Sequence, residues 1–171
     1  IDGASSVTVT VPTHNTPIAA GVNSITNKIY VANFSSNTVT IVDGLTNATT
    51  FVGAGTAPRA VAVNQVTNKV YVANDQSANV TIIDGATGTT VSKGAGAEPF
   101  AAAVNPFANA AVIANKSGDS VTAITEQVVQ PIPLQTAITP LPGNATVDTT
   151  PTFLFTASST FAPTVTPVRR V

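Results

Sequence analysis

Short runs of β-branched, aromatic and small residues alternate along the chain with clusters of Asn, Gly, Asp and Thr. Between Ala60 and Asp84, for example, the runs are AVAVN, KVYVAN and NVTIID. Runs of this length and composition, bounded by turn residues, predict β-strands. Both faces of the central run are apolar or small, which suits a sheet covered on both sides. No segment of useful length has apolar residues at helical spacing, so we predict an all-β fold.

The pattern repeats with a fixed period. Asn23, Asn64 and Asn105 follow one another at intervals of 41 residues. Three prolines keep the same interval: Pro17, Pro58 and Pro99. Self-similarity of roughly 40–45 residues with strand-like content is typical of a β-propeller blade. Each repeat therefore predicts a blade of four antiparallel strands, with the alanine-rich run as the innermost strand.

Two stretches carry a family resemblance: VNSITNKIYVANFSSNTVTIVDG and VNQVTNKVYVANDQSANVTIIDG. They resemble the YVTN family of β-propeller repeats, which is found in surface-layer and other envelope proteins of archaea and bacteria. The resemblance covers about residues 1–130. The third repeat retains Asn105, Asn109, Asn115 and Val121 but lacks the Asn-Lys-Tyr core and the Asp-Gly turn. A degenerate repeat of this kind is typical of a boundary blade.

The repeat phase predicts the organisation of the chain. Its segments are the last strand of a preceding blade (1–16), two blades (17–57 and 58–98), a degenerate terminal blade (99–130), a Pro/Thr-rich linker (131–150) and the start of an Ig-like β module (151–171). We expect Arg169 and Arg170 to be strand residues of that module. A closed propeller uses roughly four to eight blades. The other blades of this partial propeller are therefore expected from further sequence or from other copies.

Composition excludes several classes of function. Charged residues make up only 9% of the chain and the net charge is −1, so no basic patch for nucleic acid is expected. No apolar run approaches the roughly 20 residues of a membrane span. The absence of Cys excludes disulfides, thiol catalysis and thiolate metal sites. The Thr- and Asn-rich, charge-poor composition, together with the family resemblance, predicts an extracellular or cell-surface location.

The candidates for catalysis have structural interpretations. His14, the only histidine, lies in the connector PTHNTP, so we interpret it as a loop residue and not as a base or metal ligand. Asp43 and Asp84 are one repeat apart, which indicates the same hairpin turn in two blades. The Gly-x-Gly pairs of GAGTAP and GAGAEP precede a strand where a phosphate cradle needs a helix, which indicates inter-blade turns. We predict no catalytic site, no metal and no cofactor.

Two further pairs of residues recur one repeat apart. Tyr30 and Tyr71 occupy equivalent positions, which favours packing between blades over ligand stacking. Lys28 and Lys69, in the Asn-Lys turns, are expected to be solvated.

Five Asn-x-Ser/Thr sequons are possible glycosylation sites: Asn33, Asn47, Asn79, Asn115 and Asn144. Asn, Ser and Thr are frequent enough in this chain for several sequons to arise by chance.

Three functions agree with these observations. The first is a non-enzymatic structural or adhesive component of a cell envelope or extracellular assembly, with further copies, other envelope proteins and glycans as possible partners. The second is a secreted propeller that binds a protein or carbohydrate ligand. The third is part of a propeller enzyme whose catalytic residues lie in other blades. We also expect the chain to self-associate, because strands predicted in 1–16 and 151–171 lack sheets and can add to those of another copy.

Overall fold

The computed structural model describes residues 8–126. All of these residues belong to one compact unit, Ile1–Val128. The predictions for the linker (131–150), for the Ig-like module (151–171) with its two arginines, and for the sequon at Asn144 lie outside the described residues.

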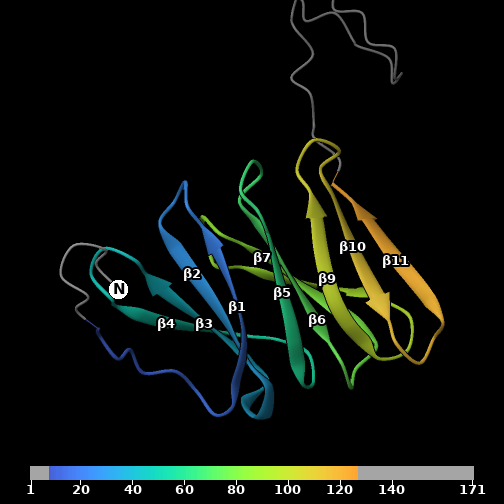
Figure 1. Ribbon diagram of the computed structural model, residues 1–171, viewed down its shortest axis with the longest axis horizontal. Helices are drawn as coiled ribbons and strands as arrows, with labels where there is room; N and C mark the ends of the chain where they lie inside the picture. The colour runs from blue at the N-terminus through green and yellow to red at the C-terminus, as the bar shows by residue number, and fades with distance from the viewer. Residues whose placement is uncertain (1–7, 127–171) are drawn as a thin grey trace, which may run out of the picture. The chain divides into compact units, whose positions relative to one another are not determined.

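The described part of the chain is all-β, as the sequence predicts (Figure 1). Its strands are β1 (Pro17–Asn23), β2 (Lys28–Asn33), β3 (Thr38–Asp43), β4 (Thr49–Gly53), β5 (Pro58–Asn64), β6 (Lys69–Asn74), β7 (Asn79–Asp84), β8 (Thr90–Gly94), β9 (Pro99–Asn105), β10 (Ala110–Asn115) and β11 (Ser120–Thr125). One 3₁₀ turn, η1 (Phe34–Ser36), joins β2 to β3, and residues 8–126 contain no α-helix.

The strands form three antiparallel sheets that follow one another along the chain. The first sheet has the order β1-β2-β3-β4 and the second the order β5-β6-β7-β8, while the third contains β9, β10 and β11. The register repeats as well: Val22 pairs with Ile29 in the first sheet, and the equivalent Val63 pairs with Val70 in the second. Within residues 8–126 the sheets do not close on one another.

Asparagine side chains shape the turn between the first two strands of each sheet. Asn27, Asn68 and Asn109 have φ angles of 53°, 55° and 46°, a left-handed conformation that Asn tolerates better than most residues. Before each of these turns, an asparagine at the end of the first strand accepts hydrogen bonds from two backbone N–H groups. For Asn23 the Oδ1 distances to the amide nitrogens of Ile25 and Thr26 are 3.0 and 3.2 Å. This geometry explains why both asparagines recur at the repeat interval.

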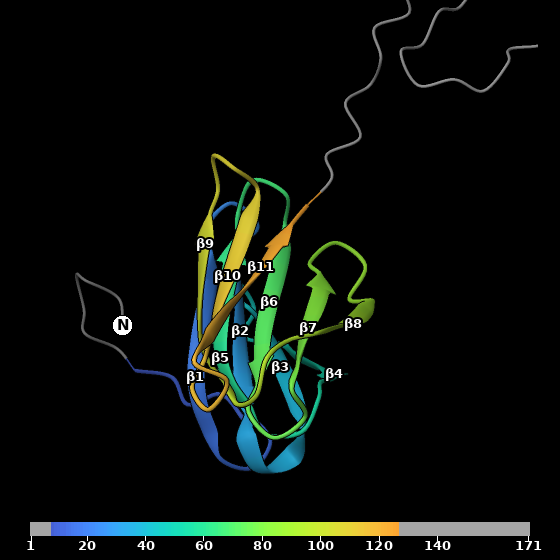
Figure 2. The ribbon, with the colours of Figure 1, turned by 90° about the vertical axis from the view of Figure 1, so that its right-hand side faces the viewer.

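Neighbouring sheets pack face to face, and their first strands lie side by side: β1 against β5 and β5 against β9 (Figures 1 and 2). Small residues allow this approach. A Cβ atom added at Gly21 of β1 would lie 2.9 Å from side-chain carbons of both Val61 and Val63 in β5. This contact agrees with the prediction that neighbouring repeats approach closely at the alanine-rich runs.

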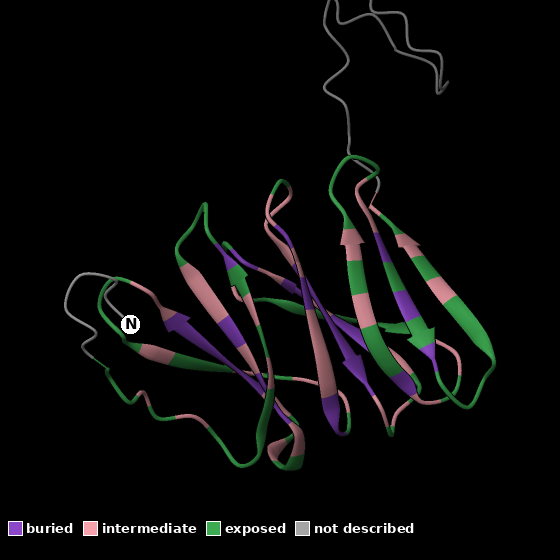
Figure 3. Cartoon of the chain, in the orientation of Figure 1, coloured by how far each residue is buried: buried purple, intermediate pink, exposed green. Residues whose placement is uncertain are grey.

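Two apolar cores fill the spaces between the sheets. Tyr30 and Val39 of the first sheet pack with Val70, Val72 and Ile83 of the second. Figure 3 shows the buried residues concentrated along the second and third strands of the first two sheets, with exposed residues along β1, β9 and β11.

The second core repeats this arrangement. Tyr71 of the second sheet packs with Ala111 and Ile113 of the third. Both tyrosines are 0% exposed, which confirms the prediction that they pack between sheets.

Residues 8–16 form no strand, whereas the sequence predicts the last strand of a preceding blade over residues 1–16. Residues 1–7 lie outside the described part of the chain. The physical reason is pairing: the equivalent strand β4 is held by β3 alone, and residues 8–16 have no strand beside them in the described structure. Val9, for example, is 65% exposed.

Each Gly-x-Gly pair begins at the last residue of a fourth strand, Gly53 or Gly94, and continues into the loop between sheets, where the sequence predicts a turn. The N–H of Gly55 donates to Oγ1 of Thr81 at 3.1 Å, and the N–H of Gly96 donates to Oγ1 of Thr122 at 3.2 Å. Each threonine also accepts a bond from a buried asparagine, which for Thr81 is Asn74 at 2.9 Å. These bonds tie the loop that leaves one sheet to the interior of the next.

We predict that Gly55→Ala destabilises the fold by about 1 to 3 kcal/mol, since overpacking a filled site costs this much. The added Cβ would lie 2.4 Å from Oδ1 of Asn79 and 2.7 Å from Nδ2 of Asn74. Gly53→Ala is the matched control, because a Cβ there meets nothing within 4 Å. Urea unfolding followed by circular dichroism measures both. Equal midpoints for the two variants would contradict the role assigned to Gly55.

Candidate binding surface

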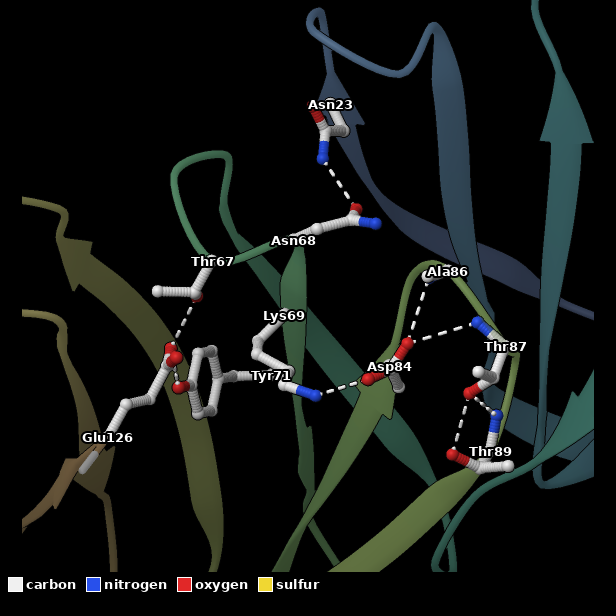
Figure 4. Close-up of polar contacts among 10 residues, drawn as sticks. All are labelled: Asn23, Thr67, Asn68, Lys69, Tyr71, Asp84, Ala86, Thr87, Thr89 and Glu126. Carbon is white, nitrogen blue, oxygen red and sulfur yellow. Dashed lines mark hydrogen bonds and ion pairs between the residues drawn. The ribbon is translucent and has the colours of Figure 1, made fainter. Parts of the chain in front are cut away.

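The two aspartates of the predicted hairpin turns are turn residues in the structure. Oδ1 of Asp43 accepts hydrogen bonds from the N–H groups of Leu45 and Thr46 at 3.0 and 2.9 Å. Oδ1 of Asp84 accepts from the N–H groups of Ala86 and Thr87 at 2.9 and 3.0 Å (Figure 4). Their carboxylates thus stabilise turns of separate sheets, and the prediction of turn residues is confirmed.

These contacts hold both aspartates in the ionised form. The N–H and hydroxyl groups of Thr46 lower the pKa of Asp43 below its ordinary value. The Lys69 ammonium donates to Oδ2 of Asp84 and, with the N–H of Thr87, holds the pKa of Asp84 well below the usual carboxyl range. A carboxyl group with this pKa is a poor proton donor or acceptor near neutral pH.

The lysines of the Asn-Lys turns are not simply solvated, so that prediction was wrong. Lys69 pairs with Asp84 of its own sheet, and Nζ of Lys28 donates to the backbone carbonyl of Gly85 in the next sheet at 2.8 Å. The four-carbon stem lets the ammonium reach across to a turn that lies near in space and far in sequence. A lysine in a turn sequence carries no signal of such a distant acceptor.

His14 is exposed, as predicted for a loop residue. Its ring stacks on Phe51 with centroids 3.8 Å apart and planes 3° apart, and Nδ1 lies 2.9 Å from Oγ1 of Thr38. Within residues 8–126, no group of three or more His, Cys, Asp or Glu side chains could hold a metal ion.

The two equivalent tyrosines differ in their hydroxyl partners. Tyr71 donates a hydrogen bond to Oε1 of Glu126, which also accepts from the Thr67 hydroxyl at 2.9 Å (Figure 4). Burial, followed by the bond to Glu126, raises the pKa of Tyr71. The buried hydroxyl of Tyr30 has no hydrogen-bond partner among the described residues, and burial, followed by the negative charge of Asp84, raises the pKa of Tyr30.

This difference follows from the degenerate third repeat. Glu126 follows Gly85 by one repeat. Gly85, next to the second sheet, lies beside the hydroxyl of Tyr30. The loss of the Asp-Gly turn thus supplies a carboxylate to the interface between the second and third sheets.

The described sequons differ in accessibility. Asn33 and Asn115 are 0% and 3% exposed and donate hydrogen bonds inside the sheets, which leaves no room for a glycan on the folded chain. Asn79 is half-buried and its Oδ1 accepts a bond from Asn74 at 2.7 Å. Asn47 is exposed in a turn with φ of 60°. Asn47 is therefore the most accessible acceptor among residues 8–126.

An open hollow of about 410 Å³ lies at the end of the sheets where the first strands begin. Its lining consists of Ile18, Phe34, Arg59 and Phe100. The Arg59 guanidinium carbon lies 3.9 Å above the Phe100 ring, and Nη1 of Arg59 lies 3.3 Å from Oδ2 of Asp75. A planar cation beside exposed apolar side chains is suited to hold a ligand with an apolar and an acidic or polar part.

Sequence reasoning missed these residues, although a signal was present. Ile18, Arg59 and Phe100 occupy the second position of the first strand in three successive sheets. Their side chains differ, whereas the proline directly before them and the alanine directly after them are the same in all three repeats. Divergence at one position of a conserved frame is expected where a repeat protein presents a binding surface, and the repeat alignment within this chain exposes it.

None of the four residues that line the hollow is a nucleophile next to a base. The one cation among these four residues, Arg59, pairs with Asp75. No helix among residues 8–126 has the length and hydropathy needed to cross a membrane.

Many solved structures resemble the chain, including the following two. Hydrazine synthase of Kuenenia stuttgartiensis matches with a TM-score of 0.60 and 23% identity over 73% of this chain and 36% of that chain. The nidogen/laminin complex matches with a TM-score of 0.53 and 12% identity over 63% of this chain and 42% of that chain. Comparisons with protein-family models and with curated proteins found no match. At these identities the likeness shows the fold alone, which is all-β and propeller-like.

We predict that Tyr71→Phe and Tyr30→Phe differ in effect. Tyr71→Phe removes the donor to a charged carboxylate and should lower the free energy of unfolding by about 1 to 3 kcal/mol. Tyr30→Phe removes a buried hydroxyl that has no partner among the described residues, so stability should stay the same or rise. Urea unfolding at neutral pH compares the two, and a larger loss in Tyr30→Phe would refute this assignment of the hydroxyls.

Stability should fall in acid. Folding lowers the pKa of Asp84. The ionised carboxylate therefore stabilises the folded chain at any pH above its unfolded-state pKa of about 3.9, and this stabilisation is lost as the pH falls through its folded-state pKa. Unfolding midpoints measured from about pH 6 to about pH 2 should therefore decrease, and Asp84→Asn should flatten the decrease. Asp43 leaves a residual slope in that variant. An identical acid slope in wild type and Asp84→Asn would exclude this role.

Proposed function

We propose that the protein is a non-enzymatic structural or adhesive component of a cell envelope or extracellular assembly, which associates with further copies of itself through its outer sheets. The observation that carries the proposal is the uncovered apolar surface of the third sheet. Val121 is 62% exposed, whereas the equivalent Val39 and Val80 are 0% exposed. A position that is core in two repeats and open in the third favours a further sheet packing there.

The fold is interpreted as part of a propeller built of YVTN-type repeats. The 41-residue period between Asn23, Asn64 and Asn105 and the four strands of each of the first two sheets support this interpretation. A closed propeller needs at least about four blades, and association between copies is one way to reach that number.

An extracellular or cell-surface location is part of the proposal. Charged residues make up 9% of the chain, and Asn47 presents an accessible sequon. These features support a protein that works outside the cytoplasm, with other envelope proteins and glycans as partners.

A second function is favoured by a specific observation: a secreted module that binds a protein or carbohydrate ligand. The hollow of Arg59, Phe100, Ile18 and Phe34 supports it, since aromatic and guanidinium groups together bind sugars and acidic peptides. Electron microscopy of native material with a labelled antibody discriminates the two functions. Label on surface arrays or fibres supports the first, and label confined to soluble monomers supports the second.

We predict that the purified 171-residue chain sediments as an assembly larger than one copy. The apolar face at Val121 should drive association, because burying apolar surface contributes roughly 25 cal/mol per Å². Sedimentation velocity over about a hundredfold range of concentration is the measurement, with circular dichroism to show that the chain is folded. A folded monomer whose sedimentation is independent of concentration would refute self-association.

A further inference from the structure

The third sheet has one strand fewer than the others in the described part of the chain. β3 pairs with β2 and β4, and β7 pairs with β6 and β8. Among residues 8–126, β11 pairs only with β10. Figure 1 shows β11 at the rim of the three sheets. The outer edge of β11 thus presents backbone N–H and C=O groups that can pair with a further strand.

Residues 8–12 have the register of a missing fourth strand. They precede Thr49–Gly53, which is β4, by one repeat of 41 residues. Their sequence, TVTVP, alternates Thr and Val and has high β-propensity. Nevertheless they form no strand in a single copy. One copy therefore has both an open edge and an unpaired segment of the matching repeat position.

The loop that follows this segment already has the geometry of a loop between sheets. The N–H of Asn15 donates to Oγ of Ser36 at 2.9 Å, and the equivalent N–H of Thr56 donates to Oγ of Ser77 at 2.9 Å. In the same way the carbonyl of Thr16 accepts from the N–H of Phe34 at 2.9 Å. Residues 15 and 16 thus bond to the first sheet in the way that residues 56 and 57 bond to the second sheet. Residues 56 and 57 follow a fourth strand, β4.

The first sheet also has an open apolar face, on the side away from the second sheet. Val22 is 54% exposed. Ile29 and Val31 are half-buried, whereas their equivalents in the second sheet, Val70 and Val72, are 0% exposed because the first sheet covers them. Within one copy, each sheet packs its apolar face on the next sheet. The exposed faces of the first sheet of one copy and the third sheet of another can form the same kind of interface.

We propose that residues 8–12 of one copy form the fourth strand of the third sheet of a second copy, paired with the outer edge of β11. This inference rests on the proposed self-association and names the segments that make it. We call the copy that supplies residues 8–12 the donor and the copy that supplies β11 the acceptor. If these segments pair as Val39 pairs with Val52 in the first sheet, Val121 of the acceptor lies opposite Val11 of the donor. The loop of residues 13–16 then places the first sheet of the donor on the third sheet of the acceptor.

The number of copies follows from the number of sheets. Residues 8–126 of each copy form three sheets, so these residues of two copies that exchange residues 8–12 bring together six. Six lies within the roughly four to eight blades of closed propellers. A head-to-tail contact of this kind closes into a ring when its rotation allows, and here it closes after two copies.

By repeat position alone, residues 131–135 are a second candidate for this edge, because they follow β8 by one repeat in the sequence. Their sequence is PIPLQ, so Pro131 and Pro133 have no backbone N–H to donate. In residues 8–12 only Pro12 lacks this donor. The greater number of N–H donors favours residues 8–12 of a second copy as the occupant.

A disulfide cross-link tests the register directly, because the chain has no Cys of its own. Opposite residues of antiparallel strands have Cβ atoms about 4.5–5.5 Å apart, close enough for a disulfide to form with little movement. The double variant Val11→Cys/Val121→Cys should give a covalent dimer on a non-reducing gel. The control Thr10→Cys/Val121→Cys places the thiols on opposite faces and should give at least tenfold less dimer. Equal yields, or a link within one chain, would overturn the proposal.

Light scattering on the full chain completes the test. Wild type should have twice the mass of the 17.2 kDa chain. Val121→Asp should have the mass of one copy, since it charges the contact face. The control Val66→Asp should remain a dimer, because Val66 is 68% exposed and its equivalents Ile25 and Phe107 are 70% and 98% exposed.

The variant Thr10→Pro/Val11→Pro tests the donor segment. In a strand, the backbone N–H of only one of two successive residues points toward the neighbouring strand, so the double substitution removes one N–H that would bond to β11. This variant should also have the mass of one copy, and residues 10 and 11 belong to no strand whose loss would unfold a copy. Assembly that persists in this variant and in Val121→Asp would overturn the inference and leave the proposed self-association intact. A monomeric wild type would overturn both. Masses above two copies would overturn closure after two.

Discussion

The structure depends on one constraint: each sheet can bury its apolar face only against the next sheet. Tyr30 and Val39 are fully buried because Val70 and Val72 of the second sheet cover them, and Tyr71 is buried by the third sheet in the same way. A single repeat of this kind cannot bury its apolar face alone. Repetition therefore stabilises the fold, and it also leaves an uncovered face at each end of the row of sheets.

Polar groups decide how closely the sheets approach. Thr81 accepts from Asn74 inside its own sheet and from the N–H of Gly55 in the loop that leaves the previous sheet. Buried donors and acceptors of this kind are costly when unpaired, so the bonds require one particular placement of the loop. Glycine at position 55 follows from the same requirement, because atoms of Asn74, Ser77 and Asn79 fill the space of a side chain. Packing and hydrogen bonding thus repeat together from sheet to sheet.

Much of the fold is predictable from the sequence, since strand positions, the turn role of Asp43 and the packing of Tyr30 depend on local pattern and period. The strand predicted at residues 1–16 did not form over 8–16, because a strand also needs a neighbour that no local pattern supplies. The acceptor of Lys28 and the stacking of Arg59 on Phe100 depend on residues distant in sequence, which come together only when the sheets pack. The hollow at Arg59 could have been found by comparing equivalent positions across the repeats.

The central claim is that the open edge of β11 is completed by another copy of the chain. Hydrogen–deuterium exchange of the backbone amides of β11 (Ser120–Thr125), measured at increasing protein concentration, tests this claim most directly. Amides at a paired edge exchange slowly, and those at an open edge exchange fast. The account predicts that exchange in β11 slows as concentration rises, while exchange in the doubly paired β7 (Asn79–Asp84) stays unchanged. Fast exchange in β11 at every concentration would contradict it.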